Sequence, residues 1–252
     1  IQLLSSYLFA EPTHLNSFYI RRGDRTEQFW TQAHVDGRRM AEVPVYVLTS
    51  RRTFSAAEEF TYNLRNLERA TIVGETTGGG AHPVEAHAIE GYPVRAMVPF
   101  GRAINPVTGT NWEGTGVAPH VEVPADQALD RAHRLALETL AEKAVDPDQR
   151  RELAWTAAML ADRAKTVELS AAELAAYAGS YGPRIVEVEG GRLVYRRGEG
   201  ARHPLHPVGG DAFLVGELDD FRVRFDRDAS GRVVALVGLY LDGREEPSPR
   251  GE

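Results

Sequence analysis

A strand–helix–strand pattern constrains the fold of this chain more than any other feature of its sequence. Val43–Ser50 (VPVYVLTS) is apolar and β-branched almost without interruption, which is typical of a strand covered on both faces in an α/β sheet. A helical pattern begins at Ser55, and Ala70–Glu75 (ATIVGE) again has the composition of a buried strand. Because this order within about thirty residues fits a parallel crossover unit, we predict an α/β domain.

The predicted helix after Ser55 has one apolar stripe, which should face the core. Its members are Ala56, Phe60, Leu64 and Leu67, and the charged residues Glu58, Glu59, Arg65 and Glu68 are expected elsewhere on the helix. Upstream, Ser17–Gly23 and Arg25–Gln32 are strand candidates joined by Gly23-Asp24, a hairpin signal.

Ser55 stands at the junction between the first strand and the helix, and its role has two interpretations. Ser55 and Glu58 match S-x-x-E, which by itself is the signature of a helix capping box. The same position suits a nucleophile, because the N–H groups of a first helical turn converge there and the helix dipole favours negative charge. In that case the N–H of Ala56 would face the developing oxyanion.

Two loops rich in glycine follow the second strand. Thr76–Pro83 (TTGGGAHP) has the freedom to shape a site, since glycine allows positive φ and close backbone approach. One or two strands and a turn are predicted in Tyr92–Pro106, and Thr108–Pro124 reads as an ordered surface loop.

The C-terminal half has a different pattern. Two helices are predicted at Asp126–Ala144 and Pro147–Lys165, the second capped by Asp146, and a short helix follows a capping box of Ser170 and Glu173. Short alternating runs separated by turns then predict antiparallel β structure. The expected organisation is therefore an α/β unit (1–143), a helical linker (144–168) and a small all-β accessory domain (169–252).

Composition excludes several classes of partner and site. The net charge of −7 provides no basic field for nucleic acid or anionic lipid, and no run approaches the ~20 apolar residues of a membrane span. Without cysteine the chain has neither disulfides nor thiolate metal sites, which leaves the compartment open. His203 and His206 are not spaced like metal ligands, so no metal site is predicted.

The residues from Val45 to Pro83, together with GTNWEGTGVAPHVEVP, resemble the C-terminal-processing (tail-specific) serine peptidase family, which includes the tricorn-type core protease and interphotoreceptor retinoid-binding protein. The resemblance covers roughly residues 1–143. It implies a crotonase-like (ClpP/crotonase) ββα core, of which this chain would hold a fragment, with Ser55 as nucleophile and the N–H of Ala56 as an oxyanion donor. It also implies a peptide or protein substrate, no metal or organic cofactor, and a bacterial periplasmic or extracellular location.

The general base distinguishes two branches of that family. The processing branch uses a lysine from the glycine-containing loop, but the only lysines here are Lys143 and Lys165, both in the predicted helical region. The chain is more similar to the tricorn-like and retinoid-binding-like branch, whose enzymes use serine, histidine and an acidic residue. Glu113 in NWEGTG matches that acidic residue, which can orient an imidazole and stabilise the imidazolium.

In that branch the histidine lies far upstream of the serine, which would place it before Ile1. The family's second oxyanion donor is on a glycine-rich turn before a helix, and IQLLSSYLF reads as the later part of that helix, so this donor would also be expected before Ile1. His82 and His87 lie near the glycine loop and are alternative local bases, although a lone histidine is more often structural.

The predicted function is that of a serine peptidase acting through an acyl-enzyme on Ser55, with Glu113 supporting the upstream histidine. A fragment without that histidine need not be active. The alternatives are a non-catalytic module of the same fold that binds a hydrophobic ligand or peptide, and a peptidase remnant kept as a scaffold. Oligomeric state and substrate preference stay open.

Overall fold

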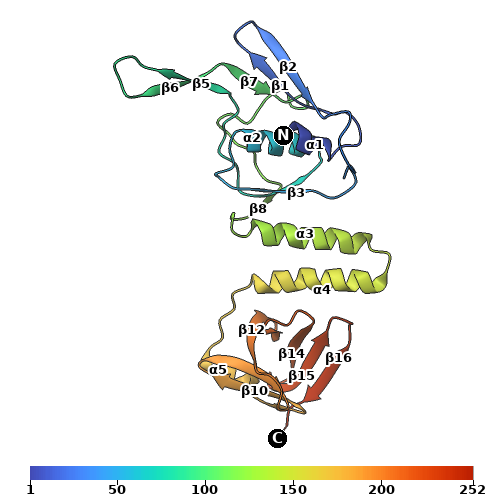
Figure 1. The fold of residues 1–252 in the computed structure, drawn as a ribbon. Helices are drawn as coiled ribbons and strands as arrows, with labels where there is room; N and C mark the ends of the chain where they lie inside the picture. The colour runs from blue at the N-terminus through green and yellow to red at the C-terminus, as the bar shows by residue number, and fades with distance from the viewer. Residues whose placement is uncertain (252) are drawn as a thin grey trace. The chain divides into compact units, whose positions relative to one another are not determined.

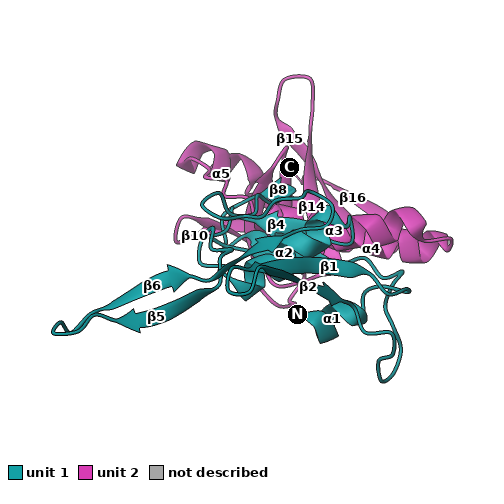
Figure 2. Ribbon diagram, turned by 90° about the horizontal axis from the view of Figure 1, so that it is seen from above, with its two compact units in different colours: residues 1–132 teal, residues 133–252 magenta. Residues whose placement is uncertain are grey.

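The computed structural model describes residues 1–251 and divides into two compact units, Ile1–Ala132 and His133–Glu252 (Figures 1 and 2). The division falls within helix α3 (Ala128–Lys143). The predicted linker 144–168 and its boundaries stay predictions.

The predicted crossover unit is present in the first unit. Strand β3 (Tyr46–Thr49) leads into helix α2 (Ala56–Asn66), and β4 (Thr71–Gly74) then pairs with β3 in parallel. A third strand, β8 (Val121–Glu122), pairs in parallel on the other side of β4. Leu64 of α2 and Ile72 of β4 form a buried cluster with Leu8, from the N-terminal segment, and Ala70, which directly precedes β4. The mixed α/β prediction is confirmed.

Strand β3 differs from the prediction that both its faces are covered. It lies at the edge of the sheet order β3-β4-β8, and Leu48 is 43% exposed. Only Thr49 of its four residues is buried. A continuous apolar run is therefore compatible with an edge strand. Such a run indicates that its residues can form a β-strand, but it does not indicate how many other elements pack against that strand.

Helix α2 also differs from its predicted stripe. Leu64 is fully buried as expected, but Ala56 is exposed and Glu58 is fully buried. The buried face of the first turn is thus polar, because Glu58 turns inward to accept hydrogen bonds from a neighbouring loop. Periodicity alone assigns charged residues to the solvent face and cannot detect such partners.

A second sheet in the same unit confirms the predicted hairpin. Strands β1 (His14–Ile20) and β2 (Arg25–Trp30) pair in antiparallel fashion around a turn in which Gly23 and Asp24 have positive φ. Strand β7 (Gly101–Ile104) pairs on the other side of β1. The first helix, α1 (Gln2–Ser6), precedes this sheet.

The loops around these sheets are ordered in two different ways. Strands β5 (Val84–Ala88) and β6 (Arg95–Pro99) form a separate two-stranded hairpin that projects from the unit, with most of its residues exposed (Figure 2). The loop before β8 is instead anchored by Trp112 and Val117, which are buried with Ala81 and Ala103.

The second unit confirms the predicted helices, caps and antiparallel β structure. Helix α4 (Pro147–Arg163) begins after Asp146, which caps it, and α5 (Ala171–Tyr177) begins with the capping box of Ser170 and Glu173. Eight antiparallel strands follow in sequence order: β9 (Gly179–Tyr181), β10 (Arg184–Glu189), β11 (Arg192–Arg197), β12 (His203–Gly209), β13 (Ala212–Val215), β14 (Phe221–Arg227), β15 (Val233–Tyr240) and β16 (Glu245–Pro249).

The two outer strands of this sheet meet. Tyr181 forms a β-bridge with Arg250, and the N–H of Gly251 donates to the carbonyl of Ser180 at 2.8 Å. The sheet is therefore a closed barrel, and its interior is filled by side chains, as expected for eight strands. Across the described residues, no helix combines the length and apolar content that crossing a bilayer requires.

Candidate active site

Ser55 occupies a strained turn between β3 and α2. Its backbone has φ 53° and ψ −121°, a conformation that costs a non-glycine residue about 1–3 kcal/mol. The residue is exposed, so its hydroxyl is open to solvent on the described chain. An exposed serine on a sharp, strained strand-to-helix turn is the arrangement that presents a nucleophile.

The capping interaction at this turn leaves the serine hydroxyl largely unused. Glu58 stands at the third helical position, and its Oε2 accepts the N–H of Ser55 at 2.9 Å. Ser55 Oγ faces the N–H of Glu58 as a capping box requires, but it does not reach the geometry of a side-chain cap hydrogen bond. The N–H of Ala56 is the first of the helix and has no acceptor among the described residues. Capping and a free hydroxyl therefore coexist.

Glu58 connects this turn to the glycine loop. Its carboxylate is fully buried and accepts from the Thr77 hydroxyl at 2.5 Å, from Gly79 N at 2.6 Å and from Gly80 N at 2.9 Å. Burial alone would raise the pKa of Glu58, but the hydrogen bonds from Thr77, Gly80, Gly79 and Ser55 outweigh it and lower the pKa. Glu58 is therefore an ionised anchor inside the protein.

Glu113 lies on the other side of the same loop. Its Oε2 accepts from Ala81 N at 2.7 Å and from His82 N at 2.9 Å, and its side chain is 43% exposed. The second oxygen, Oε1, accepts no hydrogen bond from any described residue. Glu113 is thus held in place through one oxygen while the other stays available.

The glycine loop brings the predicted residues into one neighbourhood. Consecutive residues Gly80 and Ala81 donate their N–H groups to Glu58 and Glu113, and Glu58 in turn holds Ser55. The loop is also tied to the Glu113 segment by Gly114 N, which donates to the carbonyl of Gly79 at 2.9 Å. The positions of Ser55, Ala56 and Glu113 therefore all depend on hydrogen bonds to the glycine loop, directly for Glu113 and through Glu58 for Ser55 and Ala56.

The alternative bases are placed differently. His82 Nδ1 is 3.8 Å from Glu113 Oε2, next to the site, whereas His87 is on the projecting strand β5 and is 3.9 Å from Glu85. Lys143 ends α3 and Lys165 pairs with Asp162, and both belong to the second unit. No described histidine or lysine hydrogen-bonds to Ser55 Oγ.

Sequence reasoning assigned Glu58 only a capping role and missed its bonds to the glycine loop. The available signal was the coincidence of a capping-box glutamate with a following run of three glycines, Gly78 to Gly80. Phe54 was missed as well. Its ring lies over this run, because a Cβ at Gly80 would be 2.1 Å from it, and it is 57% exposed beside Ser55.

Part of this chain is similar to known proteins in sequence and in structure. Residues 5–123 match the model of peptidase family S41. Among solved structures, the photosystem II D1 C-terminal processing protease is 21% identical with a TM-score of 0.39, over 48% of this chain and 30% of that one. Mature CPAF is 15% identical with a TM-score of 0.42, over 66% and 42% of the two chains.

A lipoprotein from Streptococcus agalactiae is 16% identical with a TM-score of 0.40, over 54% of this chain and 48% of that one. The chain thus spans less than half the length of each of these three structures.

Proposed function

Because residues 5–123 carry the sequence of peptidase family S41, we propose that this chain is the nucleophile-bearing part of a serine peptidase. Its substrate is a peptide or protein, and its N-terminal unit is a fragment of a crotonase-like core. A periplasmic or extracellular site of action belongs to the same proposal and is carried by the family alone.

One observation supports the proposal most strongly. Ser55 is exposed at φ 53°, and the buried carboxylate of Glu58 maintains that conformation through the N–H of Ser55. Strain of this kind persists only where the surrounding structure imposes it, and it is concentrated at functional sites. A simple helix cap needs neither the strain nor the bonds from Glu58 to Gly79 and Gly80.

The proposed reaction has two steps on Ser55. The hydroxyl oxygen attacks the carbonyl carbon of a peptide bond while a general base accepts its proton, and the N–H of Ala56 stabilises the resulting oxyanion. The C–N bond then breaks, and the protonated base gives its proton to the leaving amine, which leaves an acyl ester on Ser55. Water attacks that ester by the reverse proton transfers, releases the acid and restores the serine.

Glu113 has a supporting part in this scheme. Its Oε2 is fixed by Ala81 and His82, and its Oε1 is available to accept the N–H of an imidazole. A carboxylate in that place orients the imidazole and stabilises the imidazolium that forms after proton abstraction. The base is supplied by a histidine outside residues 1–252.

A fluorophosphonate probe tests the proposal on the full-length protein that contains this chain. We expect labelling of Ser55, loss of labelling in Ser55→Ala, and retained labelling in Ser50→Ala, which removes a serine at the other end of the same turn. Labelling that survives Ser55→Ala would contradict the proposal. Absence of labelling together with saturable binding of an apolar ligand would favour the non-catalytic module.

A further inference from the structure

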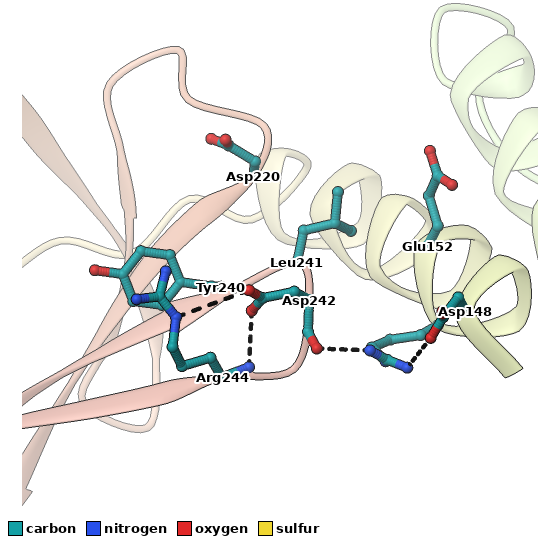
Figure 3. Close-up of a pocket in the computed structure, with 8 residues that line it drawn as sticks. Asp148, Glu152, Asp220, Tyr240, Leu241, Asp242 and Arg244 are labelled. Carbon is teal, nitrogen blue, oxygen red and sulfur yellow. Dashed lines mark hydrogen bonds and ion pairs between the residues drawn. The ribbon is translucent and has the colours of Figure 1, made fainter.

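Two cavities of opposite character meet at Tyr240 in the second unit. The first, drawn in Figure 3, has a volume of about 430 Å³ and lies between α4 and the loops at the ends of β14 and β15. The second has a volume of about 240 Å³ and is here called the Tyr195 cavity. Both have Tyr240 in their lining.

The first cavity is acidic. Its lining contains four carboxylates against two arginines: Asp148, Glu152, Asp220 and Asp242, with Arg151 and Arg244. Arg244 stacks on the Tyr240 ring at 4.0 Å from its centroid (Figure 3). Among the described residues there is no grouping of three or more side chains arranged to hold a metal ion. This cavity disfavours anions and serves below as the internal comparison.

The Tyr195 cavity is aromatic and lacks acidic side chains. Of its eight lining residues, only Arg197 and His203 can be charged, and the others are Tyr195, Gly200, Ala201, Leu218, Phe221 and Tyr240. Tyr195 and Phe221 are 5% and 8% exposed, so they belong to the wall of the barrel. At ~30 Å³ per water, the volume equals roughly eight water molecules, which suits a ligand with a short apolar body.

A buried cation lies behind this wall. Arg184 is fully buried and donates to Tyr240 Oη at 3.3 Å and to Glu246 Oε2 at 2.8 Å, while its Nε has no partner among the described residues. The other oxygen of Glu246, Oε1, accepts from Arg197 at 3.0 Å. Two guanidinium groups thus share one carboxylate, which leaves an excess of positive charge beside the cavity.

Arg197 can act toward a ligand as well as toward Glu246. Its side chain is 51% exposed, and its bond to Glu246 is the one hydrogen bond that it makes with a described side chain. A guanidinium carries five N–H donors, so most of those of Arg197 are free. They are placed at a cavity whose other walls are aromatic.

We propose that the Tyr195 cavity binds a small carboxylate with an aromatic or branched alkyl body. The carboxylate accepts hydrogen bonds from Arg197, and the body lies against Tyr195 and Phe221. The negative charge of such a ligand complements Arg197, its apolar body complements the aromatic wall, and its size fits the volume of the cavity. Every residue of this site belongs to the second unit and Ser55 belongs to the first, so the test of this site does not depend on the proposed peptidase.

The test is a titration of the full chain, followed by NMR or calorimetry, with benzoate and 4-methylvalerate at up to millimolar concentration. We expect saturable binding of both acids and none of benzyl alcohol or benzylamine. Alanyl-phenylalanine and its C-terminal amide test whether the carboxylate can be the C-terminus of a peptide. If the free dipeptide binds and its amide does not, the ligands include peptide C-termini. If benzoate binds and neither peptide does, the ligand is a free acid.

Matched variants locate the binding. Arg197→Gln should weaken benzoate binding about tenfold or more, because a charge-assisted hydrogen bond is lost. Arg196→Gln removes the same charge from the next position, on the opposite face of β11, and should leave binding unchanged. Asp242→Asn alters the acidic cavity and should also have no effect on binding.

Three results would overturn the assignment: no saturable binding of either acid, equal binding of benzyl alcohol, or wild-type affinity in Arg197→Gln. Circular dichroism of each variant confirms that the barrel is folded.

Discussion

Glu58 Oε2 accepts the backbone N–H of Ser55 at 2.9 Å from a position that solvent does not reach. The same carboxylate holds the N–H groups of Gly79 and Gly80. The conformation of the proposed nucleophile and that of the loop beside Glu113 therefore depend on one buried charge.

Replacing that charge should destabilise the first unit. Glu58→Gln keeps the size of the side chain but presents an amide N–H₂ where the protein offers donors, so we expect a loss of about 2–4 kcal/mol of unfolding free energy. Urea denaturation at neutral pH measures it.

The neighbouring Glu59→Gln is the matched control for this change. Burial raises the pKa of Glu59, and the nearby amide groups of Asn16 and Asn63 only partly offset that effect. Since the folded state disfavours the charge of Glu59, the substitution should be neutral or stabilising. Equal losses in both variants would show that Glu58 has no special role.

The pH dependence of stability should identify Glu58 as well. Its folded-state pKa lies below 4.5, so its contribution is complete above pH 4.5 and disappears as the pH falls through the folded value. The difference in unfolding free energy between wild type and Glu58→Gln should therefore be constant at neutral pH and shrink below pH 4.5. A difference that persists unchanged into strong acid would mean that ionised Glu58 is not its source.

The strain at Ser55 should be measurable by removing it. Glycine adopts φ 53° without a steric penalty, so Ser55→Gly should relieve the strain. Glycine also increases the entropy of the unfolded chain, which offsets part of this gain, so we expect a net rise of about 1 kcal/mol in the unfolding free energy. Ser55→Ala keeps the strain and should be close to wild type. If thermal denaturation finds Ser55→Gly no more stable than Ser55→Ala, the turn is not strained as described.

The approach of the Glu113 loop to the glycine loop can be tested at two glycines of similar φ. Gly116 has φ 71°, and a Cβ there would lie 2.2 Å from the carbonyl oxygen of Thr77. Gly109 has φ 68° with open space around it. Both alanine substitutions carry the φ penalty, so Gly116→Ala should be more destabilising than Gly109→Ala by about 2 kcal/mol, the cost of the clash. Similar stabilities would mean that the two loops can separate freely.

The sequence allowed much of this fold to be predicted, because its signals are local. The β1–β2 hairpin, the crossover from β3 to β4 and the caps at Asp146 and Ser170 follow from turn residues and periodicity. The inward turn of Glu58 and the exposure of Leu48 did not follow, since each depends on residues distant in sequence. Glu58 has its partners in the glycine loop, about twenty positions later.

The candidate site shows the same limit. Ser55 and Glu113 were identified by motif, and the structure adds the loop that supports both. Their catalytic roles stay predictions. No pattern in the sequence pointed to the pairing of Arg184 and Arg197 on Glu246, because alternating arginines and apolar residues also describe an ordinary barrel wall.

The closure of the eight-stranded barrel through Tyr181 and Arg250 has a consequence for folding. Each strand pairs with its neighbour along the chain, so most strand pairings form over short loops, whereas the closing contact joins residues about seventy positions apart. The contact between the two outer strands leaves less unpaired strand edge open to a second molecule, and Pro247 and Pro249 in β16 further disfavour edge-to-edge pairing. The pairing of Tyr181 with Arg250 is therefore expected to form late in the folding of the C-terminal unit, after the hairpins between neighbouring strands.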